Sequence, residues 1–126
     1  MSDSGRITLE DTEGETRIRL TLRFDRAWAS VVKGTEDADF VIDDRDRSEG
    51  LLYVTFVGPQ DEEDSGWFDW LWGGEDEHPL AGHQYQIHLD RAGEELTLIT
   101  LRGPDGGEVD RRDQQALLTI LRGNIT

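Results

Sequence analysis

The chain has 126 residues, a length that suits one domain able to bury its own core. It contains no cysteine, which excludes disulfides, cysteine-zinc sites and thiol nucleophiles, and its formal net charge of −15 argues against binding to nucleic acid or to an anionic membrane. No stretch of about 20 apolar residues occurs, so the sequence predicts no transmembrane helix.

The chain is expected to start with a flexible leader, a strand and a helix. Residues 1–15 form the leader, with room for a short strand at 6–9; they contain no apolar signal core, so an exported native protein would be longer than this chain. Apolar and polar residues alternate over 16–22, which predicts a half-buried strand. Helical spacing follows over 24–38. Gly34 should cost this helix about 1 kcal/mol relative to alanine and weaken its last turn.

A charged turn separates a short strand at 40–43 from a strong strand at 51–57, which is rich in branched and aromatic residues. Arginines interleave with the acids of this turn, which favours ion pairing over a metal site or an acid-base pair. Ser48 has no partner base and is not a plausible nucleophile. We assign a structural role in the turn to Asp43, Arg45, Asp46, Arg47, Ser48 and Gly50.

The segment 60–82 is predicted to be a long loop, acidic at both ends and rich in tryptophan in the middle. Its large apolar groups have three alternative roles: they fold back on the core, they contact a partner, or they contact a membrane interface. Tryptophan is enriched in binding hot spots, which supports the second role. The candidate partner-binding residues are Trp67, Phe68, Trp70, Leu71 and Trp72.

The last third of the chain predicts a hairpin and a closing helix. Strands at 84–89 and 96–101 flank a connection at 90–95. After a stop rich in glycine, Asp110 is placed to cap the final helix, with Asp113 completing a partial capping box.

We identify no catalytic, cofactor-binding or metal-binding residues, and we do not expect an enzyme. The histidines at positions 78, 83 and 88 lack the spacing of a zinc site, and His88 should face solvent or the sheet edge. The glycine-rich stretch at 103–107 lacks the lysine of a phosphate-binding loop.

The order of these elements predicts an α+β fold, in which a curved antiparallel sheet packs against two helices and grips the C-terminal one. We expect residues 16–126 to form this single domain, with 60–82 as its long loop.

Several of these features together resemble the BamC (NlpB) family, lipoprotein subunits of the machinery that assembles β-barrel proteins in the bacterial outer membrane. An aromatic residue and a tryptophan open the first helix, an Asp-Arg-Ser-x-Gly turn precedes a strand, and a tyrosine-bearing strand, hairpin, Asp-Gly turn and last helix follow. The matching residues are Phe24, Trp28, Asp46, Arg47, Ser48, Gly50, Tyr85, Asp105 and Gly106.

The resemblance implies a helix-grip domain, the C-terminal of the two that this family carries. It further implies a non-catalytic protein-protein interaction domain acting in outer-membrane β-barrel protein assembly, with other subunits of the machinery as partners. In that family, contact with the BamD lipoprotein and the lipid anchor in the outer membrane use segments absent from this chain. The domain would then be periplasmic or surface-exposed. The alternative is a domain that binds a small apolar ligand or lipid in the groove between sheet and helix.

Overall fold

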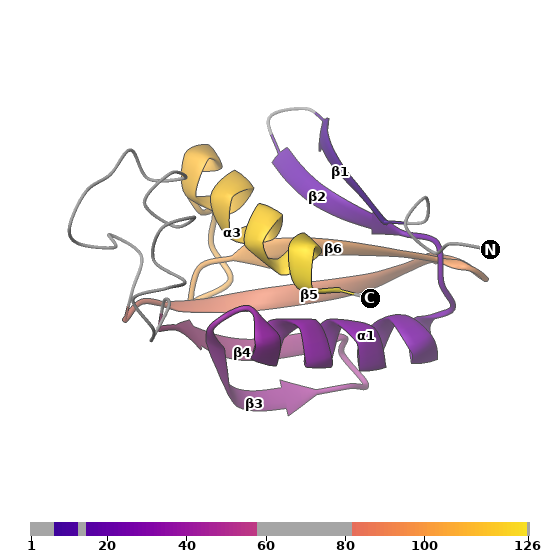
Figure 1. Ribbon diagram of the computed structural model, residues 1–126, viewed down its shortest axis with the longest axis horizontal. Helices are drawn as coiled ribbons and strands as arrows, with labels where there is room; N and C mark the ends of the chain where they lie inside the picture. Colours follow the sequence, from indigo (N-terminus) through magenta and orange to yellow (C-terminus); the bar gives the residue numbers. More distant parts are fainter. Residues whose placement is uncertain (1–6, 13–14, 58–81, 126) are drawn as a thin grey trace.

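The computed structural model describes residues 7–12, 15–57 and 82–125 (Figure 1). These residues form one antiparallel sheet of six strands in the order β1-β2-β6-β5-β4-β3, with two helices packed against it. The elements are β1 (Ile7–Thr12), β2 (Glu15–Leu20), α1 (Phe24–Asp37), β3 (Phe40–Asp46), β4 (Leu51–Phe56), β5 (Gln84–Gly93), β6 (Leu96–Arg102) and α3 (Arg111–Asn124). The predicted α+β helix-grip architecture is confirmed.

The core fills the layer between the sheet and both helices. Alternate residues of the strands point inward, and Ile18, Leu52 and Ile99 are fully buried. The helices contribute Val31 from α1 and Leu117 from α3, also at 0% exposure. Burying each such side chain contributes about 1.5–3 kcal/mol. Hydrophobic burial therefore holds the helices on one face of the sheet.

Gly34 serves the packing of the two helices. α1 continues to Asp37, past the glycine that was expected to weaken its last turn. A Cβ atom on Gly34 would lie 2.9 Å from Cγ1 of Ile125 and 3.2 Å from the carbonyl oxygen of Asn124. The absent side chain therefore lets the end of α3 approach α1 closely, and tertiary packing outweighs the low helix propensity of glycine.

The strands are longer than predicted. β3 was expected to end at residue 43, but its pairing with β4 continues across a β-bulge as far as Asp46 opposite Leu51. Asp43, Arg45 and Asp46 therefore lie in β3, and the turn is confined to residues 47–50. The ladder hydrogen bonds of β4 extend the strand through these charged residues because their side chains can remain exposed.

Two further boundaries differ in the same way. β5 was expected to end at residue 89, but it pairs with β6 as far as Gly93, so the connection between the two strands is only two residues long. β1 lies within the segment predicted as a leader and pairs with β2 over six residue pairs. Whether the domain begins at residue 16 remains a prediction.

Besides its apolar packing, α3 is hydrogen-bonded to the sheet through the buried side chain of Gln114, which is 4% exposed. Its Oε1 accepts a hydrogen bond from the backbone N–H of Thr16 at 2.8 Å, and its Nε2 donates to the carbonyl of Leu101 at 3.1 Å. The ladder between β2 and β6 runs from Leu20–Thr97 to Ile18–Ile99. If the same register continued for two more residues, Thr16 would pair with Leu101. The amide of Gln114 thus occupies the place of a ladder hydrogen bond.

Candidate functional site

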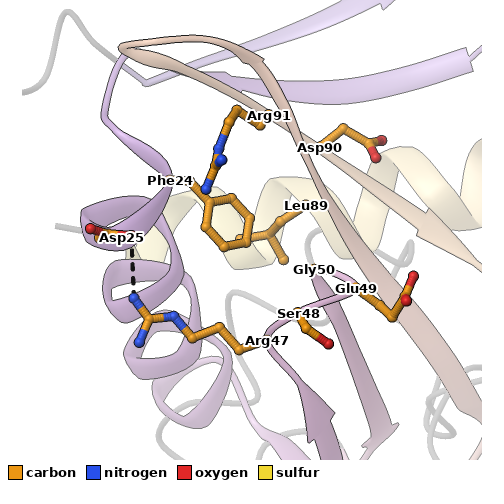
Figure 2. Close-up of a pocket in the computed structure, with 9 residues that line it drawn as sticks. All are labelled: Phe24, Asp25, Arg47, Ser48, Glu49, Gly50, Leu89, Asp90 and Arg91. Carbon is orange, nitrogen blue, oxygen red and sulfur yellow. Dashed lines mark hydrogen bonds and ion pairs between the residues drawn. The ribbon is translucent and has the colours of Figure 1, made fainter.

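An open hollow lies where the turn 47–50, the start of α1 and the end of β5 meet (Figure 2). Its volume is about 660 Å³. The lining residues are Phe24, Asp25, Arg47, Ser48, Glu49, Gly50, Leu89, Asp90 and Arg91. The hollow combines one aromatic ring with two arginines and three carboxylates, so both apolar and charged groups of a bound molecule would find contacts there.

Gly50 fixes the turn side of the hollow against β5. Its φ of +65° lies in the left-handed region, and its N–H donates to the carbonyl of Arg47 at 3.1 Å. The carbonyl of Gly50 accepts the N–H of Leu89 at 2.7 Å. A Cβ atom on Gly50 would lie 2.2 Å from the carbonyl oxygen of Leu89. Only glycine allows this approach, so the turn is pinned to its neighbouring strand.

Phe24, the first residue of α1, forms the aromatic wall. Its ring stacks on that of Trp28 with centroids 6.1 Å apart, and the guanidinium carbon of Arg91 lies 5.0 Å from the centroid of Phe24. Figure 2 shows Arg91 reaching over the ring from β5. Such a cation-π contact contributes about 0.5–1 kcal/mol at an exposed site. A second hollow of about 650 Å³, bordered also by Arg23 and Glu94, adjoins the same ring.

An ion pair and several hydrogen bonds order the turn side of the hollow. Arg47 Nη2 lies 3.3 Å from Asp25 Oδ1, an exposed ion pair of the kind that contributes about 0–1 kcal/mol. Ser48 donates its hydroxyl to Asp46 Oδ1 at 2.8 Å, and the N–H of Glu49 donates to the same oxygen at 3.2 Å. These contacts order the turn.

The histidines do not assemble a metal site in the described ranges, where no three histidine or acidic side chains converge. His88 lies on the central strand β5, half-buried, with its Nε2 3.0 Å from Gln86 Oε1. Burial lowers the pKa of His88, the Arg102 charge lowers it further, and Asp90 opposes both. His83 is exposed, and position 78 lies outside the described residues.

The predicted partner-binding residues Trp67, Phe68, Trp70, Leu71 and Trp72 also lie outside the described residues. The structure does define where their segment leaves and rejoins the sheet. Gly82 donates its N–H to the carbonyl of Phe56 at 2.6 Å, and Phe56 donates to the carbonyl of His83 at 3.0 Å. This neck is at the far end of β4, about 17 Å along the strand from the turn of the hollow.

Tyr85, close to this neck, carries the clearest pH dependence of the domain. Burial, with a smaller contribution from Asp113, raises the pKa of Tyr85 from 10.0 to about 12. The folded state therefore favours the neutral phenol of Tyr85. The resulting stabilisation of the folded state is complete below pH 10 and is lost as the pH rises towards 12. We expect the free energy of unfolding to fall by up to about 2 kcal/mol across this window, and to fall less in Tyr85→Phe.

Denaturant unfolding of both proteins at several pH values between 9 and 11.5 measures this difference. Equal losses in the two proteins would show that the phenol of Tyr85 is not the responsible group.

Two features of the structure were not predicted from the sequence. The contact between Phe24 and Arg91 joins residues far apart in the chain, and no local pattern marks either as a pair. Gln114 sits among the apolar positions of α3 and could have been singled out as a polar residue on a buried helical face.

Across the described part of the chain, neither helix has the length and apolar character needed to cross a membrane. A family model described as the outer membrane protein assembly factor BamC-like C-terminal domain matches residues 4–125. The chain is 31% identical over 127 aligned residues to the outer membrane protein assembly factor BamC of Thiobacillus denitrificans, which covers 98% of this chain and 32% of that protein.

A second relative has the same name, the outer membrane protein assembly factor BamC, and comes from Pseudoalteromonas atlantica. It is 30% identical over 93 residues, which cover 73% of this chain and 24% of the relative. The chain therefore spans about a third or less of the length of these relatives.

Proposed function

The chain belongs to the family of BamC-like C-terminal domains, and from this premise we propose that it is a non-catalytic docking domain in outer-membrane β-barrel protein assembly. Its partners would be other subunits of the assembly machinery. Contact with a BamD-type lipoprotein and a lipid anchor in the outer membrane would belong to parts of the protein outside this chain. The domain would act in the periplasm or at the cell surface.

The observation that carries this proposal is the hollow around Phe24. The guanidinium of Arg91 on β5 lies over the ring of Phe24 on α1. Gly50 holds the turn 47–50, which forms the third wall of the hollow, against β5. Aromatic residues and arginine are enriched in protein interfaces and in their hot spots. Because the groups sit on packed elements, they would lose little conformational freedom when a partner binds.

We propose the tryptophan segment as a second docking surface. Trp67, Phe68, Trp70, Leu71 and Trp72 bring together large apolar groups of the type that dominate binding hot spots. Its neck and the hollow lie at opposite ends of β4, so the two surfaces are tested separately.

We expect the double variant Trp70→Ala/Trp72→Ala to bind the purified assembly machinery at least about 30-fold more weakly than wild type, since hot-spot residues contribute 2 kcal/mol or more. Arg91→Ala tests the hollow, and a loss of about fivefold is expected there. Arg122→Ala, a change of an exposed residue on α3, is the control. Titration of the immobilised machinery with each domain variant gives the affinities. Undiminished binding by both test variants would remove both surfaces from the interface.

The alternative, a small apolar ligand or lipid between sheet and helices, is less well supported. Fully buried side chains of Val31, Leu117 and Ile99 fill that layer, and the two hollows beside Phe24 are bordered largely by charged residues. A saturable rise in melting temperature with a lipid or an apolar ligand would favour the alternative.

A further inference from the structure

The sheet ends at β3, which pairs with β4 on one side only. Among the residues that the structure describes, no strand pairs with its other side. Asp39 accepts the N–H of Val57 at 3.0 Å, and backbone groups of an antiparallel strand point alternately toward and away from the partner. The N–H and C=O groups of Phe40 and Ile42 therefore face the open side, where an added strand would find them.

The outer face of β3 and β4 carries an exposed apolar pair. Val41 is 49% exposed and Tyr53 is 36% exposed, and they are the two most exposed large hydrophobic side chains in the described ranges. Their neighbours Phe40, Leu52 and Val54 are buried on the helix side, so the alternation of the strands turns Val41 and Tyr53 away from the helices.

Three aspartates follow Val41 along β3 toward the turn, and Asp44 is the residue opposite Tyr53. Asp43 accepts the Thr55 hydroxyl at 2.6 Å, Asp44 accepts the N–H of Arg45 at 2.9 Å, and Asp46 accepts the Ser48 hydroxyl at 2.8 Å. These donors are uncharged hydroxyl or backbone groups. In the described part of the chain, none of the three aspartates forms an ion pair, so their negative charge is left for a partner to neutralise.

We propose that this surface, the β3 edge (Val41, Asp43, Asp44, Asp46 and Tyr53), docks an extended segment of a partner protein that carries lysine or arginine and adds to the sheet as a strand. The inference rests on the proposed docking function and names its site and the chemistry of its partner. Unpaired backbone groups would bind the segment's backbone, the apolar pair its apolar side chains, and the aspartates its cations.

The charge of the edge decides against two other occupants. A second copy of the chain, pairing β3 with β3, would bring two sets of aspartates together, and each copy has a net charge of −15. An anionic membrane would be repelled in the same way. Charged residues and bulges also protect open edges from aggregation, and this purpose alone requires no partner. The experiment must separate protection from docking.

The probe is a synthetic peptide of about eight residues in which valine and lysine alternate, titrated into the isotopically labelled chain. We expect saturable changes in the amide resonances of β3, with the dissociation constant rising about tenfold in Asp44→Asn/Asp46→Asn. The control Glu36→Gln/Glu108→Gln removes the same charge from exposed positions on α1 and before α3, outside both β3 and the hollows beside Phe24, and should change affinity less than twofold. Val41→Ser should weaken binding about fivefold.

The same variants are then titrated against the purified assembly machinery. A tenfold loss in Asp44→Asn/Asp46→Asn, with the control unaffected, supports the β3 edge as the site. Equal loss in the two charge variants, or peptide-induced changes outside β3, would overturn the inference and leave protection as the role of the edge. If the machinery does not bind the wild-type chain while the peptide does, the proposed docking function fails and the strand-binding edge remains.

Discussion

Replacing Gly50 with alanine should lower the free energy of unfolding by about 3 kcal/mol. A left-handed backbone costs an L-residue about 1–2 kcal/mol, and forcing an atom into a packed position costs about 1–3 kcal/mol more. Both costs apply at Gly50, where φ is +65° and the new Cβ would lie 2.2 Å from the carbonyl oxygen of Leu89. The turn and β5 would have to separate, which would also deform the hollow beside Phe24. Denaturant unfolding measures the change.

Gly106→Ala is the matched control. Gly106 also has a positive φ, +84°, but the nearest atom to its Cβ would be 3.7 Å away. This variant should lose only about 1 kcal/mol, from backbone strain. The difference between the two variants isolates the close approach to Leu89. Equal losses would mean that β5 moves away from the turn without cost, contrary to a pinned wall.

The second large effect is expected for Gln114→Leu, with a loss of about 3 kcal/mol in the free energy of unfolding. The substitution leaves the N–H of Thr16 and the carbonyl of Leu101 without the amide that bonds both. A buried polar group left unsatisfied costs about 1–3 kcal/mol, and the gain from burying leucine only partly offsets two of them.

Gln115→Ala changes the adjacent residue of α3, which is exposed and whose amide lies 3.4 Å from Asp11 Oδ2. It should stay within about 0.5 kcal/mol of wild type. Hydrogen exchange gives a second readout, because only Gln114→Leu should release protection at Thr16. A Gln114→Leu protein as stable as Gln115→Ala would show that the buried amide does not hold α3 on the sheet.

Local patterns in the sequence were sufficient to predict helices and strands, and also the N-terminal cap of α3. The branched and aromatic residues of 51–57 predicted β4, and the helical spacing over 24–38 predicted α1. The predicted cap of the closing helix is confirmed, because Asp110 Oδ1 accepts the N–H of Arg112 at 2.9 Å.

Features that depend on distant residues could not be predicted in this way. Helix propensity alone makes Gly34 unfavourable in α1. The reason for a glycine at this position is the close packing of Ile125, which follows a distant helix. The extension of β3 to Asp46 depends on pairing with β4, and the charges of the segment resemble those of a turn. The pairing of Phe24 with Arg91 likewise needs β5 to be in place.

Direct titration of the wild-type chain against the purified machinery is the best test of the proposed docking of this domain onto the outer-membrane assembly machinery. We expect saturable binding with a dissociation constant of about 10 µM or lower. Failure to bind at about 100 µM, under conditions where a longer BamC relative does bind, would rule out docking by this domain.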